Sequence, residues 1–364
     1  MSEFDTIVGL VSEYSPSGKE GGAVTWLVAR MKALGYEKAF IDDAGNAIGV
    51  IGEGPRLVVL LGHIDTVPGQ IPVARISDSS PAEKGELLYG RGAVDAKGPL
   101  ACFVDAAAKV GRKTGWQFVV IGAVEEERDS AGARFIMDRY KPDFAIIGEP
   151  TRWDRVALGY KGSAWVSVTI QRPQAHTASG EETAAESAVE VWLKIKAHAA
   201  EFNRDKQKVF DQLLLTLQAI ESGSNEFEQS TRLKLGVRLP VEVSPDDWYG
   251  KLEEILKSSE SSTVSIERTG FAIPAWKCEK NTQLVRALLI GIRSNGGEPR
   301  FVYKTGTADL NIIAPVWKCP TVVYGPGDSS LDHTPNEHLA LEEYAKAVQI
   351  LCTTLHKLGS ELTY

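Results

Sequence analysis

The sequence has little cysteine, and no two of its cysteines lie close together. The four are Cys102, Cys278, Cys319 and Cys352, with no Cys-x-x-Cys pair. A disulfide framework in a small secreted domain needs many cysteines at short spacings, so this usage favours four reduced packing residues. Reduced cysteines are typical of proteins of the cytoplasm, and we expect that location.

Long apolar runs and a targeting signal are also missing. The longest purely apolar run is Leu57–Leu61, whereas a bilayer-spanning helix needs about 20 such residues. The N-terminal residues Met1–Asp5 are acidic and polar, without the basic start and apolar stretch of a secretory signal. The sequence therefore predicts neither a transmembrane helix nor secretion.

Positive charge is in deficit as well: 40 Lys and Arg face 48 Asp and Glu, a formal net charge of −8. This balance argues against a general nucleic-acid binder, which needs a basic face. With 43% hydrophobic and 24% charged residues, the 364-residue chain has an ordinary globular composition. At roughly 150 residues per domain, two domains are expected.

The first part of the chain alternates apolar strands with helices. We predict buried strands at 56–62, 117–122 and 144–148, and helices at 96–110 and 132–140. Buried strands separated by helices indicate an α/β domain with a mostly parallel central sheet covered on both faces.

The middle of the chain has a different pattern. Residues 164–170 and 232–239 alternate apolar and polar side chains, which is typical of antiparallel strands with one solvated face. Helices are expected at 181–201 and 244–257. We therefore predict an α+β domain at 161–271, inserted into the first domain.

The α/β pattern then resumes, with a helix at 282–293, a strand at 319–324 and a closing helix at 341–358. The catalytic domain is thus predicted to be discontinuous, formed by residues 1–160 and 272–364.

Acidic and histidine side chains follow several of these core strands. His63 and Asp65 come directly after one strand, and residues two apart in an extended chain point the same way. His63 is a candidate metal ligand whose second ring nitrogen is oriented by Asp65, or the two form an ordinary hydrogen bond. Asp95 follows Gly90 and Gly92 where the chain enters a helix, so it is a candidate ligand or a helix N-cap.

Three further segments carry carboxylates and imidazoles. Glu125, Glu126 and Glu127 follow the strand at 117–122, Glu149 ends the strand at 144–148, and His333 lies in a polar loop before the last helix. The carboxyl ends of parallel strands meet at one sheet edge. Such a mixture of ligands suits two Zn²⁺-like ions, a bridging carboxylate and one remaining acid that acts as general base.

These segments resemble those of the M20 family of di-zinc peptidases and deacylases. The resemblance rests on GHIDTVP (62–68), GRGAVDAKG (90–98), the triple glutamate, Glu149 and HTPNE (333–337), in that order. It implies a zinc-binding α/β domain with an inserted α+β lid domain that dimerises, giving a homodimer.

The resemblance also implies roles for individual residues. His63 and Glu149 become ligands of one metal, His333 of the other, with Asp95 as the bridge and Asp65 as the partner that orients His63. The family spacing fits Glu126 as the base and Glu127 as a ligand, but a register one residue earlier, Glu125 and Glu126, stays open. The peptide after the bridging aspartate, Asp95–Ala96, is expected to be cis.

In the insert, His176 matches the family's lid histidine, which reaches the active site of the partner subunit and stabilises the oxyanion. Arg238 and residues 305–309 match positions near the substrate. The implied cofactors are two divalent metal ions, Zn²⁺ or Co²⁺.

Within the family, the likeness is strongest to hydrolases that release lysine or ornithine from the terminal Glu side chain of an acidic amino-group carrier protein in lysine and arginine biosynthesis. The runs LYGRGAVDAKGPL and IGEPTRWDRVALGYKG carry this likeness. Three alternatives stay open. The first is deacylation of a small acyl amino acid such as N-acetylornithine or N-succinyl-diaminopimelate, or another aminoacylase or peptidase activity of the family. The second is metal binding without catalysis. The third, a serine hydrolase, is disfavoured because no Gly-x-Ser-x-Gly motif is found.

Overall fold

A computed structural model describes residues 3–78, 85–257 and 263–358 of the chain. Two compact units are formed: one from 1–159, 278–303 and 308–364, the other from 160–277 with 304–307. The boundaries expected from the sequence were 160/161 and 271/272. Each unit has its own main sheet.

The central sheet of the first unit has the strand order β1-β2-β6-β3-β7-β15-β8. The four strands β6, β3, β7 and β15 run parallel, whereas β1, β2 and β8 pair antiparallel at the edges. A further strand, β14 (Arg300–Lys304), pairs with β8. The strands of the main order are β1 (Lys38–Ile41), β2 (Ala47–Ile51), β3 (Arg56–His63), β6 (Trp116–Ala123), β7 (Phe144–Gly148), β8 (Arg155–Tyr160) and β15 (Thr321–Val323).

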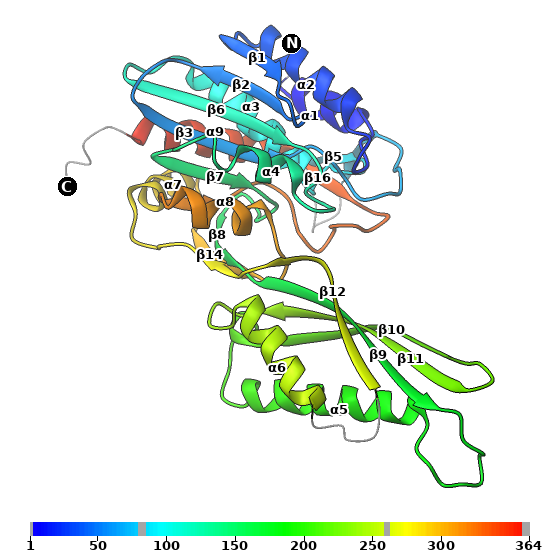
Figure 1. Ribbon diagram of the computed structural model, residues 1–364. Coiled ribbons are helices and arrows are strands. Elements are labelled where there is room, and N and C mark those ends of the chain that lie inside the picture. The colour runs from blue at the N-terminus through cyan, green and yellow to red at the C-terminus, as the bar shows by residue number, and fades with distance from the viewer. Residues whose placement is uncertain (1–2, 79–84, 258–262, 359–364) are drawn as a thin grey trace. The chain divides into compact units, whose positions relative to one another are not determined.

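Helices lie on both faces of this sheet. In Figure 1, α3 and α9 lie behind the sheet while α4 and α8 lie in front of it; α3 packs on β3, β6 and β7, and α4 packs on β6 and α8. Helix α9 packs against α3 and α7, and α2 packs on β1 and β2. The helices are α1 (Asp5–Ser12), α2 (Gly21–Ala33), α3 (Lys97–Val110), α4 (Ala131–Ile136), α7 (Gln283–Ser294), α8 (Asp309–Trp317) and α9 (Leu341–Lys357).

A small antiparallel sheet, β16-β5-β4, lies under α9 in the same unit. Its strands are β4 (Ala74–Asp78), β5 (Gly85–Tyr89) and β16 (His338–Ala340). It pairs His338 with Tyr89, so it ties the loop before α9 to the segment that follows β5.

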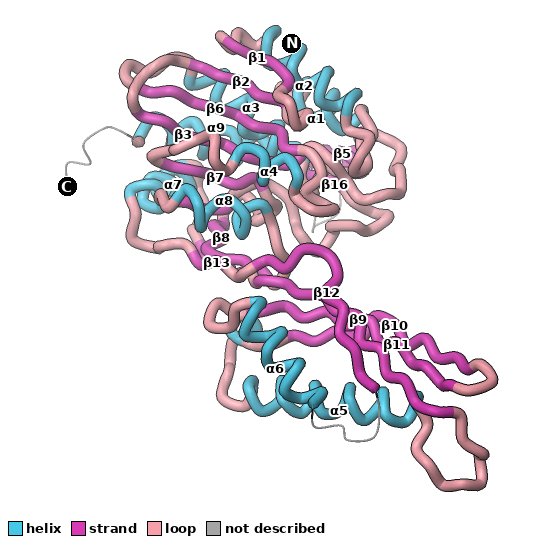
Figure 2. The backbone as a smooth tube through the Cα atoms, in the orientation of Figure 1, coloured by secondary structure: helices cyan, strands magenta, loops and turns pink. Residues whose placement is uncertain are grey.

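The second unit is an antiparallel sheet, β10-β11-β9-β12, with two helices packed on it (Figure 2). Alternate apolar side chains of β9 and β11 meet apolar side chains of α5 and α6 in one buried core. Helix α5 begins with a capping box in which Thr183 and Glu186 each accept the other's backbone N–H. The elements are β9 (Gly162–Pro173), α5 (Ala184–Asn203), η1 (Val209–Asp211), β10 (Leu214–Ser224), β11 (Glu228–Leu239), α6 (Pro245–Lys257), β12 (Thr263–Ile273) and the short β13 (Trp276–Lys277).

The α/β fold with a mostly parallel centre is confirmed, and strands β3, β6 and β7 lie within one residue of their predicted bounds. The helix predicted at 132–140 was too long, because α4 ends at Ile136. The N–H of Arg139 bonds to the carbonyl of Ile136 at 2.9 Å, three residues back rather than four, so the α-helical pattern is not continued. Pro142 also disfavours helical backbone at Lys141.

All four cysteines are free, and Cys102 and Cys278 are buried. Over the described part of the chain, no helix has the length and apolar character that a membrane crossing requires.

Candidate metal centre

Three parallel strands bring three candidate site residues to one edge of the central sheet. His63 is the last residue of β3, Glu149 directly follows β7, and Glu126 lies three residues beyond β6. Since β3 pairs in parallel with both β6 and β7, the carboxyl ends of all three strands meet here.

Asp95 reaches the same edge from a tight turn before α3. Gly92 has a φ of +87°, and a Cβ there would meet Thr66 Cγ2 at 2.8 Å, so the turn requires glycine at this position. The Asp95–Ala96 peptide bond is cis, as the resemblance implied.

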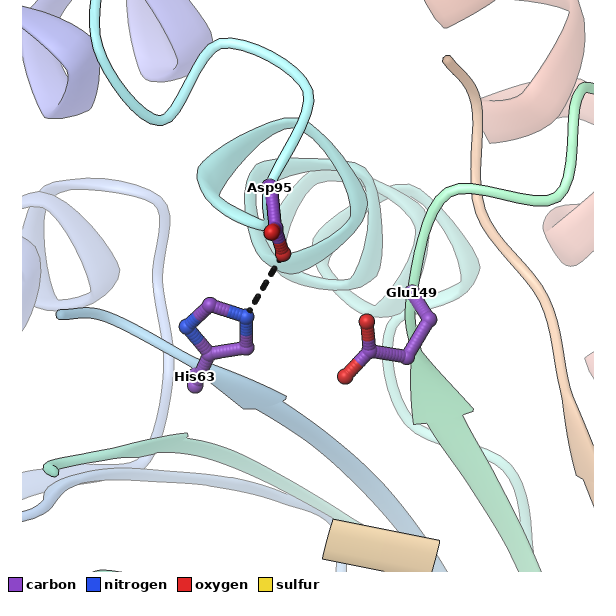
Figure 3. A group of neighbouring side chains, drawn as sticks. All are labelled: His63, Asp95 and Glu149. Atoms are coloured by element: carbon purple, nitrogen blue, oxygen red, sulfur yellow. Dashed lines mark hydrogen bonds and ion pairs between the residues drawn. The ribbon is translucent and has the colours of Figure 1, made fainter. Parts of the chain in front are cut away.

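His63, Asp95 and Glu149 form what we term the inner ligand group (Figure 3). One ligand atom from each lies within 4.8 Å of the other two, and His63 Nε2 lies 3.1 Å from Asp95 Oδ1. The other ring nitrogen of His63, Nδ1, lies 3.0 Å from the backbone carbonyl of Asp65 and 3.5 Å from its carboxylate. The tautomer with the proton on Nδ1 therefore directs the Nε2 lone pair at Asp95.

Asp95, Glu127 and His333 form the outer ligand group. His333 Nε2 lies 3.1 Å from Asp95 Oδ2 and 3.0 Å from Glu127 Oε1. The two oxygens of Asp95 thus face two different histidines. This is the geometry of a carboxylate shared between two ligand groups.

The ligand types and distances fit a pair of divalent metal ions. Two imidazoles and three carboxylates match the ligands of Zn²⁺ and similar ions. Around a tetrahedral ion with bonds of about 2.0 Å, neighbouring ligand atoms lie about 3.3 Å apart, close to the separations seen here. An imidazole lone pair aimed at a carboxylate oxygen is also unfavourable unless a proton or a cation lies between them.

The electrostatics of the site point in the same direction. Burial raises the pKa of Glu149 well above its ordinary value, and Asp95 and Asp309 add to this. Burial lowers the pKa of His63, but Asp65 and Asp95 outweigh it and the pKa rises well above the usual value. Hydrogen bonds to Asp95 and Glu127 raise the pKa of His333 to about 10. The carboxylates therefore favour a positive charge among them.

The three consecutive glutamates have separate surroundings. Glu125 adopts a φ of 61°, and its carboxylate forms an ion pair with Arg128. Burial raises the pKa of Glu126 well above its ordinary value, and Glu127 belongs to the outer group.

Asp65 holds the turn that carries these glutamates. Its carboxylate accepts the backbone N–H groups of Glu126 at 3.0 Å and Glu127 at 3.1 Å, and the hydroxyl of Ser17 at 2.7 Å. Asp65 also contacts the ring of His63, so this one residue links the inner ligand group to the turn of Glu126 and Glu127.

The candidates in the second unit are more exposed. His176 lies on the loop between β9 and α5, where its Nδ1 accepts the N–H of Ala178 at 3.1 Å. Arg238, on β11, donates to the hydroxyl of Thr307 at 3.2 Å. In the first unit, Asp309 is 2% exposed, and burial raises its pKa to about 6.

Two residues around the site were not predicted as functional from the sequence. Ser17 orients Asp65, as described above, and lies in no recognisable motif. Glu337 is fully buried and accepts the backbone N–H groups of Val94 and Asp95. The HTPNE segment contains Glu337, but nothing in its spacing indicates which backbone groups it contacts.

The sequence model of peptidase family M20/M25/M40 matches residues 59–357. A curated LysW-lysine hydrolase of Deinococcus radiodurans is 40% identical over 354 residues, which cover 96% of this chain and 94% of that protein. A LysW-lysine/LysW-ornithine hydrolase of Sulfurisphaera tokodaii is 28% identical over 96% of this chain and 95% of that one.

Among solved structures, aminopeptidase PepT of Bacillus cereus has a TM-score of 0.79 at 18% identity, covering 98% of both chains. The YXEP protein of Bacillus subtilis, described as a dinuclear metal-binding peptidase, has a TM-score of 0.69 at 11% identity, covering 96% of both. These structural likenesses concern the fold alone.

Proposed function

Because the chain belongs to peptidase family M20/M25/M40, an amidohydrolase family acting on linear amides, we propose that it releases lysine from an amino-group carrier protein of the LysW type. The bond cut is the amide between the amino acid and the side-chain carboxyl of the carrier's terminal Glu. The support for this substrate is the 40% identity to a LysW-lysine hydrolase over nearly the whole chain. Ornithine is a second leaving amino acid, since relatives such as that of Sulfurisphaera tokodaii carry both names.

Two divalent ions, Zn²⁺ or Co²⁺, are the proposed cofactors. His63 and Glu149 would hold one, Glu127 and His333 the other, and Asp95 both. The observation that carries this proposal is the placement of the two Asp95 oxygens, each 3.1 Å from a different histidine. When bound, such a pair of ions acidifies the water between them and polarises the amide carbonyl.

Glu126 is the proposed general base. Its backbone is fixed by Asp65, and burial raises its pKa, as suits a group that accepts a proton near neutral pH. It takes the proton of the attacking water and hands it to the departing amine of lysine. The ion pair between Glu125 and Arg128 supports this register over the earlier one.

His176 of a second copy of the chain is the proposed oxyanion donor, which makes the working enzyme a homodimer. Its place on an exposed loop of the second unit leaves the ring accessible to another subunit. An imidazole N–H donating to the developing oxyanion stabilises the transition state more than the substrate.

The proposal is tested by mass-spectrometric turnover with Zn²⁺- or Co²⁺-loaded enzyme. Carrier protein amidated with lysine, or with ornithine, is compared with N-acetylornithine and N-succinyl-diaminopimelate, each with and without a chelator. We expect fast, chelator-sensitive release from the carrier and slow turnover of the small substrates. A preference for a small acyl amino acid would contradict the carrier substrate and leave the metal chemistry intact.

Salt provides a second test of the partner. The carrier expected from the family is acidic, so it should bind to basic residues of the enzyme around the active site. Salt weakens this attraction because ions screen it. We expect kcat/KM for the carrier substrate to fall as salt rises, while kcat/KM for N-acetylornithine changes little.

A further inference from the structure

Glu337 is a fully buried carboxylate that belongs to neither ligand group. It lies four residues after His333 and directly before β16. One of its oxygens, Oε2, accepts a hydrogen bond from Nη1 of Arg91 at 2.7 Å. The side chain of Glu337 is 1% exposed and that of Arg91 is 7% exposed. Arg91 is itself held by a bond from Nε to the carbonyl of Gly69 at 2.9 Å. A buried charge pair of this kind is costly to break, so the carboxylate is fixed in place.

The other oxygen of Glu337 faces the backbone next to the bridging ligand. Oε1 accepts the N–H of Val94 at 2.9 Å and the N–H of Asp95 at 3.1 Å. Two charge-assisted hydrogen bonds therefore fix the main chain of the residue whose carboxylate lies between the two histidines.

The main chain of Glu337 fixes the same region from its own side. Its carbonyl accepts the N–H of Gly90 at 3.3 Å, and the next residue, His338, pairs with Tyr89 between β16 and β5. The loop that carries His333 and the turn that carries Asp95 are thus joined at Glu337 through side chain and backbone together.

We propose that Glu337 is a positioning residue of the metal centre: clamped by Arg91, it sets the separation of Asp95 and His333 and hence the affinity of the outer ligand group for its ion. This inference rests on the proposed two-metal function. The inner group depends less on Glu337, because His63 and Glu149 are positioned by β3 and β7.

The test is Glu337→Gln. Glutamine keeps the shape but loses the charge, and whichever way its amide turns, an N–H₂ group faces either Arg91 or the two backbone N–H groups. Binding is followed by calorimetric titration of the metal-free protein with Co²⁺ and by the visible absorption of the bound Co²⁺. We expect the second ion to bind about 10–100-fold more weakly, with the first ion little affected. We also expect kcat to fall at unchanged KM.

Asp105→Asn is the matched control for stability. Asp105 is a buried carboxylate on α3, the helix that begins after Asp95, and it accepts the hydroxyls of Thr6 and Tyr344 rather than any group of the metal centre. Both variants should lower the urea midpoint, but Asp105→Asn should bind both ions as the unsubstituted protein does. Equal Co²⁺ affinities in the two variants would reduce Glu337 to a structural residue and overturn the inference.

Arg91→Lys covers the case in which Glu337→Gln does not fold. It keeps the positive charge but loses the two-pronged contact to Glu337 and Gly69, so the second ion should bind more weakly than to the unsubstituted protein, by less than 10-fold. An unchanged second-ion affinity in Arg91→Lys would count against the clamp. If the unsubstituted protein binds only one ion per chain, the two-metal function fails and this inference fails with it.

Discussion

The inner and outer ligand groups share Asp95 but differ in how the protein holds them. In the inner group, His63 has a side-chain exposure of 1% and Glu149 is 7% exposed; in the outer group, the side chain of His333 is 52% exposed. His63 ends one strand of the central sheet and Glu149 directly follows another, whereas Glu127 and His333 lie on loops.

This difference indicates two ways of building one site. The parallel sheet positions the inner ligands as a consequence of its register, because β3 and β7 pair residue by residue up to Gly62 and Gly148. The outer ligands depend on hydrogen bonds between loops, those of Asp65 to the glutamate turn and those of Glu337 to the Asp95 turn. The inner and outer ligand groups should therefore differ in metal affinity, in the rate of metal exchange and in sensitivity to substitution.

The largest expected effect concerns Glu126, which belongs to neither ligand group. Glu126→Gln removes the proposed base without removing a ligand, so kcat should fall by about 10²–10⁴-fold while both metal ions stay bound. Single-turnover kinetics and metal analysis of the same preparation measure the two quantities. The control is Glu125→Gln, which weakens the ion pair with Arg128 outside both ligand groups and should keep its activity.

The opposite result, normal turnover in Glu126→Gln and no activity in Glu125→Gln, would favour the other register. Glu125 would then be the base and Glu126 the metal ligand. Loss of one metal ion in Glu126→Gln would make Glu126 a ligand, and the division into two groups would have to be redrawn.

The next effect compares the two histidines directly. His333→Ala leaves the inner group intact, so the variant should keep one ion, and that ion should exchange slowly with a chelator because the site is buried. His63→Ala removes the buried ligand, so the ion that remains should be the fast-exchanging one. Release of metal to a chromogenic chelator measures both rates. Equal release rates in the two variants would show that burial does not make the inner ligand group release its ion more slowly than the outer one.

The ligands of both groups were predicted from the sequence, whereas Ser17 and Glu337, which hold Asp65 and Asp95, were not. The apolar runs of β3, β6 and β7 predict buried strands, and residues at their ends predict the inner ligands, because register in a parallel sheet follows from the hydrophobic pattern. The roles of Ser17 and Glu337 depend on hydrogen bonds to residues 48 and 242 or more positions away in the sequence. Such contacts have no periodicity, so only the folded backbone reveals them.

Helices and strands outside the centre show the same limit. The antiparallel edge strands β1 and β2 were not predicted, since their short runs carry little pattern of their own. Helix α4 was predicted four residues too long, because nothing in the sequence pattern shows that the N–H of Arg139 bonds three residues back to Ile136. The hydrophobic pattern therefore predicts that an element exists better than it predicts where the element ends.

The smallest expected effect concerns Asp105, a buried carboxylate of the same unit that lies outside both ligand groups. Burial raises its pKa, although hydrogen bonds from Thr6 and Tyr344 oppose this. The folded protein therefore binds more protons here than the unfolded chain, and the stability that Asp105 contributes declines as pH rises from about 4 to its folded pKa.

Asp105→Asn cannot titrate, so the difference in unfolding free energy between the unsubstituted protein and this variant should shrink with rising pH across that window. Urea unfolding of metal-free protein at several pH values measures it, and metal removal keeps the histidine ligands from contributing through binding. A difference that instead grows with pH would mean that Asp105 is held as an anion in the fold. Asp105 would then be, like Glu337, a buried carboxylate that the fold keeps charged outside the ligand groups.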